Sequence, residues 1–212
     1  IAMAWMNQIS RRTLQGDEVR DARMGWLIII GSLPIVILGY LGQDLIRDNF
    51  RSLWLIAIVL IVFGIILGIA DKYGKTERQL HELTPAHGIL YGLAQSLALV
   101  PGVSRSGATI AMGRFLGYSR EAALRYSFLL ALPAVFGSGL YELKGAIGDT
   151  SSTQPFSLPE TFVATVIAFV IGYAVIAWIL KYVTTKSFAP FIAYRIGLGS
   201  LLLIALSTGM IS

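Results

Sequence analysis

The sequence predicts an all-α polytopic membrane protein, with five full spans and one re-entrant helix pair at about residues 87–117. Three observations lead to this class. Of the 212 residues, 55% are hydrophobic and 14% are charged, whereas a water-soluble domain carries about 25% charged residues. Uncharged runs recur that are long enough to cross roughly 30 Å of hydrocarbon as helices. One further apolar segment is shorter and is broken by Pro101-Gly102.

The five predicted spans are joined by segments of different character. Pro34 lies inside the first span and Pro133 inside the third, and we expect a kink at each because proline removes a helical hydrogen bond. An amphipathic connector, Gln43–Ser52, follows the first span, and a polar loop, Gly145–Pro159, follows the third. The predicted spans are residues 25–42, 53–70, 121–143, 162–180 and 196–212.

Residues 87–117 lack the pattern of an ordinary span. His87–Val100 would be about 21 Å long as a helix, and Gly107–Gly117 makes a second short helix beyond the Pro101-Gly102 break. Two short helices that meet at such a tip indicate a pair that dips to mid-membrane and returns to the same side. Irregular backbone at that depth is tolerated where protein or a water-filled cavity surrounds it.

The distribution of Lys and Arg favours this topology. With a re-entrant pair, nine basic residues lie on one side and three on the other, in agreement with the positive-inside rule. A full crossing of the pair would change the split to eight against four. The nine are Arg11, Arg12, Arg20, Arg23, Lys72, Lys75, Arg78, Lys181 and Lys186, and the three are Arg47, Arg51 and Lys144.

The tip of the pair carries the strongest indication of function. Arg105 is the one charged residue between Gly88 and Gly113, and a charge among apolar membrane residues is costly and usually functional. A guanidinium matches the oxygens of phosphate or carboxylate, and a helix that starts near Gly107 would direct free N–H groups at the same anion. The sequence therefore predicts a phosphate cradle. Its other members are Gly102, Ser104, Ser106, Gly107 and Thr109.

A structural interpretation of the same residues stays open. Arg105 could pair with an acid or with carbonyl groups elsewhere, while the serines assist helix packing. Gln95, on the helix that enters the tip, is typical of an interhelical hydrogen bond. Arg195 lies near the start of the last predicted span, where it either reaches out to water or makes a second phosphate contact. His87 is expected to be solvated.

Other chemistry is limited by what surrounds the tip. Its nearest acids in sequence are Glu82 and Glu121, so the segment can bind phosphate and stabilise developing charge but cannot readily activate water. The net charge of +5 comes from basic residues split among short loops, which excludes a nucleic-acid partner.

Ile1–Met6 has the composition of the last turns of an apolar helix, and we expect the chain to belong to a longer protein.

Residues Ala94–Thr109, AQSLALVPGVSRSGAT, resemble the signature of bacterial undecaprenyl-diphosphate phosphatases, the BacA/UppP family. The resemblance extends from about Trp5 to the C-terminus. It includes the run Leu116–Leu140, the Gly31-Ser32-Leu33-Pro34 segment, and Phe191–Arg195 before the final helix.

The resemblance implies an enzyme of the bacterial plasma membrane. Such enzymes convert undecaprenyl diphosphate to undecaprenyl phosphate, the lipid carrier of peptidoglycan synthesis, and are associated with bacitracin resistance. The family has an inverted-repeat fold with two re-entrant pairs and uses a divalent cation, Mg²⁺ or Ca²⁺. By this resemblance Arg105 clamps the diphosphate and its transition state and Ser104 joins it in catalysis. Gly102, Ser106, Gly107 and Thr109 bind phosphate, and Gln95 and Arg195 are secondary candidates.

One part of the family pattern is missing from these 212 residues. The first family motif, two glutamates and a Pro-Val-Ser-Ser-x-Gly-His loop, is expected to precede Ile1 and to supply the metal ligands, the nucleophile and the acid/base group. Residues 1–212 are thus expected to form a single membrane domain, about the C-terminal three quarters of the family fold, and to be inactive alone. Three alternatives stay open: a carrier or flippase for an anionic polyprenyl phosphate, a subunit completed by a partner, and a homodimer.

Overall fold

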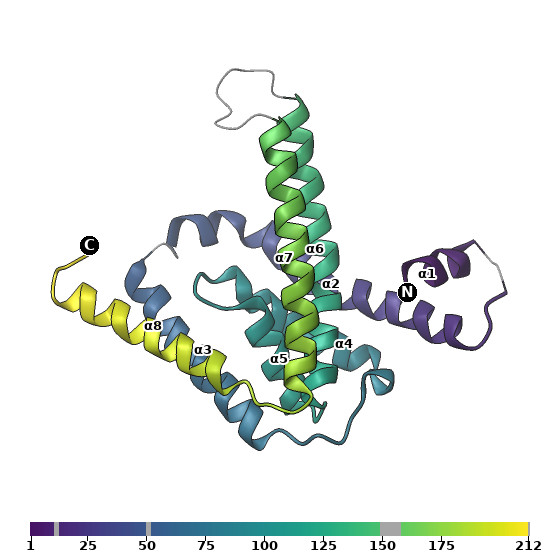
Figure 1. The fold of residues 1–212 in the computed structure, drawn as a ribbon, viewed down its shortest axis with the longest axis horizontal. Coiled ribbons are helices and arrows are strands. Elements are labelled where there is room, and N and C mark those ends of the chain that lie inside the picture. Colours follow the sequence, from purple (N-terminus) through teal and green to yellow (C-terminus); the bar gives the residue numbers. More distant parts are fainter. Residues whose placement is uncertain (11–12, 50–51, 149–157, 212) are drawn as a thin grey trace.

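The computed structural model describes residues 1–10, 13–49, 52–148 and 158–211. Helices make up most of these residues (Figure 1). Two single-turn 3-10 helices, η1 (Leu80–Glu82) and η2 (Leu97–Leu99), lie before and after α4. The α-helices are α1 (Ala2–Ile9), α2 (Asp17–Asn49), α3 (Leu53–Tyr73), α4 (Pro85–Ser96), α5 (Arg105–Phe115), α6 (Arg120–Gly148), α7 (Leu158–Val183) and α8 (Ala189–Ser207).

Five of these helices have the length and apolar composition of membrane spans, which confirms the predicted polytopic class. They are Asp17–Gly42, Leu53–Tyr73, Arg120–Leu140, Pro159–Val183 and Ala189–Ser207. In Figure 1, α6 and α7 project away from the other helices, and α8 lies beside α3. The apolar side chains of α7 are exposed over most of its length, as expected of a helix in contact with lipid.

Several predicted boundaries are wrong. Helix α2 continues to Asn49, through residues that were expected to form the Gln43–Ser52 connector. Helix α8 begins at Ala189, seven residues before Ile196, because Pro190 occupies its first turn, where a missing N–H costs nothing. Arg195 therefore lies within α8. Most of the predicted Gly145–Pro159 loop, and the side chains of the connector, lie outside the described residues.

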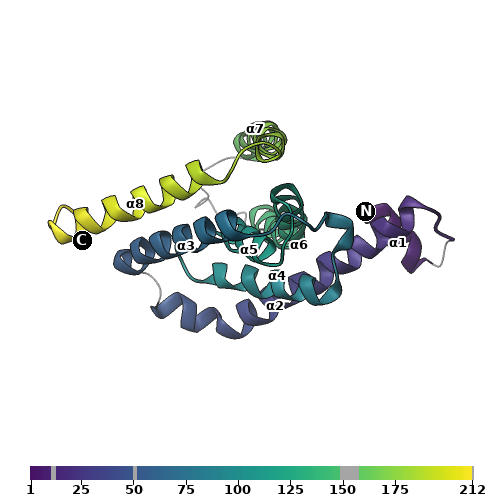
Figure 2. The ribbon, with the colours of Figure 1, turned by 90° about the horizontal axis from the view of Figure 1, so that it is seen from below.

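The short helices α4 and α5 form the predicted re-entrant pair. Both ends of the pair meet, because the Arg78 N–H donates to the Gly117 carbonyl at 3.0 Å and the Ser119 N–H donates to the Arg78 carbonyl at 2.9 Å. At the start of α4, the Thr84 hydroxyl accepts from the His87 N–H, and Pro85 takes the first helical position. In Figure 2 α4 lies between α2 and α3. The chain thus enters and leaves at one end.

Close contact between α4 and α2 fixes the position of the pair. A Cβ atom on Gly92 would lie 2.1 Å from the Gly31 carbonyl oxygen, so only glycine fits at this crossing. Small residues of this kind allow helices in membranes to pack backbone against backbone.

We expect Gly92→Ala to destabilise the protein by about 1–3 kcal/mol, since the added methyl group forces two backbones apart. Thermal unfolding in detergent, followed by tryptophan fluorescence, measures the effect. Gly172→Ala is the matched control, because a Cβ at Gly172 would meet nothing within 4 Å. Equal melting temperatures for the two variants would contradict the tight crossing.

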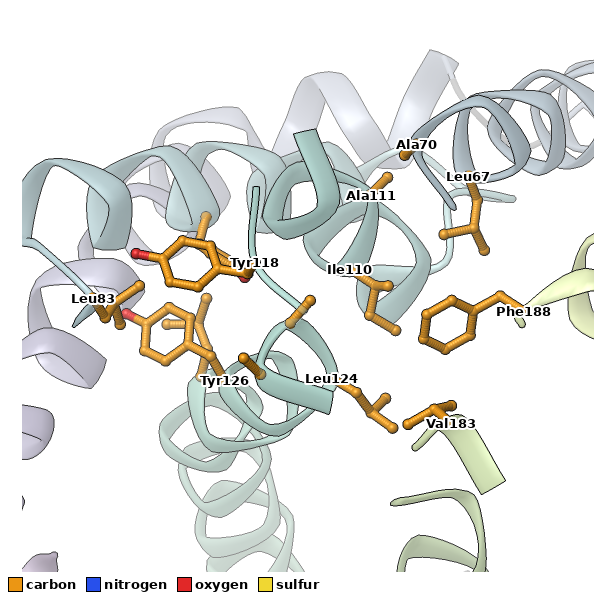
Figure 3. Close-up of a cluster of buried hydrophobic side chains, with 14 of the residues drawn as sticks. Leu67, Ala70, Leu83, Ile110, Ala111, Tyr118, Leu124, Tyr126, Val183 and Phe188 are labelled. Carbon is orange, nitrogen blue, oxygen red and sulfur yellow. The ribbon is translucent and has the colours of Figure 1, made fainter. Parts of the chain in front are cut away.

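A buried cluster joins the pair to the rest of the fold (Figure 3). Ile110 and Ala111 of α5 face Leu67 and Ala70 of α3, and Phe188, just before α8, closes the cluster from the side. On the other side of α5, Tyr126 of α6 donates its hydroxyl proton to the Leu27 carbonyl of α2 at 2.8 Å. The pair is therefore held from three directions.

A buried arginine closes the end of the pair that lies away from the tip. Arg114 is 1% exposed, and it donates to the carbonyl oxygens of Gly74 at 2.6 Å, Lys75 at 2.9 Å and Tyr118 at 2.6 Å. Asp71 lies 3.8 Å from the Arg114 guanidinium. We refer to Arg114, Asp71 and these carbonyl groups as the Arg114 cluster.

Asp71 extends the Arg114 cluster to α6 and α8. Its carboxylate accepts from Arg120 at 2.5 Å and from the Phe188 N–H at 3.1 Å. The Arg114 cluster therefore brings together the end of α3, both ends of the re-entrant pair, and the beginnings of α6 and α8. These helix ends lie on the side of the protein that carries most of the Lys and Arg residues.

Candidate phosphate-binding site

The tip between α4 and α5 is a tight turn at Pro101-Gly102. Gly102 has a φ of +91°, which L side chains rarely adopt. A Cβ there would also lie 2.9 Å from the Ile56 carbonyl oxygen of α3. The turn is therefore built for glycine and packs against the first part of α3.

The tip lies beside the first turn of the α3 span, at the end opposite the Arg114 cluster. Ile56, which contacts the tip, and Asp71, in the Arg114 cluster, lie on the same helix, roughly 22 Å apart at about 1.5 Å per residue. The hydrocarbon core is roughly 30 Å thick. The tip is thus far from the basic side of the protein and within the hydrocarbon layer.

Helix α5 starts at Arg105, two residues earlier than predicted, because Ser104 caps it. The Ser104 hydroxyl accepts from the Gly107 N–H at 3.1 Å, the preferred arrangement for a helix N-cap. The N–H groups of Arg105 and Ser106 have no acceptor within the described part of the chain. Two backbone donors and the positive end of the helix dipole therefore lie at the tip.

Arg105 itself is partly buried. Across the described residues its guanidinium has neither an ion pair nor a hydrogen bond, so the structural interpretation, in which an acid or a carbonyl satisfies it, finds no partner there. The Ser104 and Ser106 hydroxyl oxygens lie 3.3 Å apart, on the same first turn. These groups can donate to one tetrahedral anion.

Thr109 lies behind the tip and not at its surface. It is fully buried, and its hydroxyl contacts the Arg105 carbonyl at 2.9 Å and Ser127 of α6 at 2.5 Å. This hydroxyl therefore holds the first turn of α5 against α6. The prediction that it contacts phosphate directly does not fit this placement.

Arg195 reaches the tip from α8. Its Nη2 donates to the Gly102 carbonyl at 2.9 Å, and its buried Nε has no partner in the described chain. The expectation that Arg195 reaches out to water is therefore wrong, because α8 begins early enough to carry this residue into the membrane interior. Two guanidinium groups, from α5 and α8, border the same turn.

Gln95 is fully buried on α4, and neither polar atom of its side chain has a partner among the described residues. An unpaired buried amide costs about 1–3 kcal/mol. The interhelical hydrogen bond predicted for it is therefore not formed with the described residues. His87, in contrast, is not simply solvated, since its Nδ1 lies 2.7 Å from the Tyr118 hydroxyl.

The described residues supply no recognisable metal ligands. They contain no group of three or more His, Cys, Asp or Glu that could hold a metal ion. A separate cavity of about 840 Å³ lies between α2, η1 and α6, with Arg23, Leu83 and Glu121 in its lining, but it contains none of the tip residues.

Five helices with the composition of membrane spans, with a re-entrant pair packed among them, define the class: a multi-pass α-helical membrane protein. Residues 1–201 match the family described as Bacitracin resistance protein BacA, and the chain belongs to this family. It is thus a multi-pass protein of the bacterial membrane.

Several curated relatives align with the whole chain. A protein of Pseudarthrobacter chlorophenolicus named undecaprenyl-diphosphatase is 56% identical over 212 residues, covering 100% of this chain and 76% of its own length. A protein of Clavibacter michiganensis with the same name is 53% identical, with the same coverage. A protein of Agrobacterium fabrum named undecaprenyl-diphosphatase 2 is 53% identical and is covered over 74% of its length.

Proposed function

We propose that this chain acts in the hydrolysis of undecaprenyl diphosphate to undecaprenyl phosphate and phosphate, and that the α4–α5 tip holds the diphosphate. The observation that supports this most strongly is Arg105, which is partly buried beside the capped N-terminus of α5 and has no partner among the described residues. Relatives that are more than 50% identical to this chain are named undecaprenyl-diphosphatase.

Binding follows from the donors at the tip. The Arg105 fork and the N–H groups of Arg105 and Ser106 would take oxygens of the diphosphate, while the hydroxyls of Ser104 and Ser106 orient it. Gly102 and Gly107 keep the backbone close to the anion. The polyprenyl chain would extend into lipid, beside the exposed apolar helices.

Catalysis follows from charge stabilisation. Over the whole reaction, the oxygen of one water becomes bonded to the terminal phosphorus, the bond from that phosphorus to the bridging oxygen breaks, and the bridging oxygen leaves with undecaprenyl phosphate. Negative charge grows on the phosphoryl and leaving oxygens, where fixed donors are most effective. The proton of the attacking water needs a base, and the sequence holds no Asp, Glu or His between Gly88 and Arg120.

The acid/base group and the ligands of a divalent cation are therefore assigned to the first family motif, which these 212 residues do not contain. The cation would withdraw charge from the phosphate oxygens. This assignment predicts that purified residues 1–212 release no phosphate above background from farnesyl or undecaprenyl diphosphate.

The assay is phosphate release in detergent with no membrane gradient, on residues 1–212 and on the full-length protein. Release by the full-length protein supports an enzyme, while its absence would favour the carrier, since half-helix N-termini also bind anionic substrates in transporters. Turnover by residues 1–212 alone would overturn the assignment of the base to the first motif.

Arg195 is proposed as a positioning residue and second phosphate contact. Its bond to the Gly102 carbonyl fixes the tip, and its remaining donors are available to the ligand. Arg195→Gln should lower kcat/KM about tenfold, which corresponds to about 1.4 kcal/mol and to the loss of one charge-assisted hydrogen bond. Separate kcat and KM values identify the role, because a purely structural arginine would change the melting temperature and leave KM as it was.

A further inference from the structure

A second site lies at the opposite end of the re-entrant pair from the tip. There, a hollow of about 460 Å³ lies between the end of α3 and the turn that follows α5, bordered by Tyr73, Lys75, Arg78 and Phe115. In the structure, the membrane-span helix α3 ends at Tyr73 and the next such helix begins at Arg120. The hollow is therefore at the level where the membrane meets water, on the basic side.

The lining combines cations with exposed aromatic rings. Lys75 is 75% exposed, and Arg78 is exposed with one guanidinium nitrogen bound to the Leu116 carbonyl at 2.5 Å. Tyr73 and Phe115 are 71% and 53% exposed. Aromatic rings at this depth are typical of contact with lipid at the headgroup level.

Nearby acids offset only part of this positive charge. Glu77 also lines the hollow and forms an ion pair with the Lys75 ammonium at 3.8 Å, while Arg78 has no acidic partner among the described residues. Asp71 is already paired with Arg114 and Arg120. A further cation, Lys72, lies over the ring of Tyr73, 5.3 Å from its centre. The hollow and its rim therefore carry an excess of positive charge.

We infer that this hollow binds the headgroup of an anionic phospholipid, with the phosphate between Lys75 and Arg78 and the glycerol and acyl chains against Phe115 and Tyr73. Basic pockets between membrane helices on the basic side of a protein favour such headgroups. The lipid would contact the Arg78–Gly117 junction, at which the re-entrant pair begins and ends. The site does not depend on the proposed enzymatic function, since it lies roughly 22 Å from the tip along α3.

Native mass spectrometry of the detergent-purified protein, with equimolar phosphatidylglycerol and phosphatidylcholine added, tests the site. The wild type should retain phosphatidylglycerol in preference. In the double variant Lys72→Gln, Lys75→Gln, the ratio of bound phosphatidylglycerol to bound phosphatidylcholine should fall about fivefold. A fall of this size corresponds to the loss of about one effective charge near the membrane surface.

The matched control is Lys181→Gln, Lys186→Gln, which removes the same charge from the same side but outside the hollow, and it should keep the wild-type ratio. Equal retention of both lipids by the wild type would overturn the site. So would an unchanged ratio in the Lys72, Lys75 variant, or an equal loss in both double variants, which would show diffuse attraction to the whole basic face.

Discussion

In the full-length protein, Arg105→Lys is expected to lower kcat/KM for undecaprenyl diphosphate at least about tenfold, or about 1.4 kcal/mol in the barrier. Lysine keeps the charge but loses the planar fork that meets two phosphate oxygens at once. Arg105 is expected to act mainly on the transition state, so kcat should fall more than KM rises. Arg105→Ala, which removes the charge as well, should lose about 100-fold or more.

The control for Arg105 is Arg125→Lys. Arg125 forms an exposed ion pair with Glu121 at 3.0 Å, and such pairs contribute about 0–1 kcal/mol. Its replacement should leave both kinetic constants near the wild-type values. Wild-type turnover by Arg105→Lys would remove Arg105 from the mechanism.

Arg114→Met should have the largest effect on stability, about 3–5 kcal/mol, because it leaves buried carbonyl groups at the Arg114 cluster without a donor and Asp71 with one cation fewer. The side chain donates to the carbonyls of Gly74 and Lys75, just after α3, and to that of Tyr118. With a fall of about 2–4 °C per kcal/mol, the melting temperature in detergent should drop by about 10 °C. Arg114→Lys should also destabilise, since one ammonium cannot reach all of these oxygens.

Arg20→Met is the matched control for Arg114. Arg20 is 72% exposed and pairs with Asp17 on the surface of α2, so its loss should change the melting temperature by no more than about 2 °C. If Arg114→Met has the same melting temperature as Arg20→Met, the Arg114 cluster does not hold the end of the re-entrant pair.

The fold was largely predictable because the bilayer imposes a simple rule on the sequence. Every predicted span has a helix in the structure, and the re-entrant pair is confirmed by two short helices whose ends meet through Arg78 and Gly117. Boundaries were harder. The start of α5 depends on a serine cap, and that of α8 on a proline in its first turn, both of which are local effects of one or two residues.

The site was predictable where it is continuous in sequence. Arg105 and the serines beside it stand out because they interrupt an apolar run. The contact of Arg195 with the tip was not predicted, because its partner, the Gly102 carbonyl, is 93 residues away. Every residue has a backbone carbonyl, so the sequence does not show which one accepts a hydrogen bond. Arg114 was missed for the same reason: beside Arg120 and Arg125 it has the pattern of a basic helix end, while its acceptors are carbonyl groups.

The most direct measurement is the affinity of the full-length protein for a non-hydrolysable diphosphate, farnesyl methylenediphosphonate, by titration calorimetry in detergent. If the tip holds the diphosphate through the Arg105 fork, wild type and Arg125→Lys should bind with equal affinity, and Arg105→Ala should bind at least about tenfold more weakly. Equal affinity of Arg105→Ala and wild type would contradict the account.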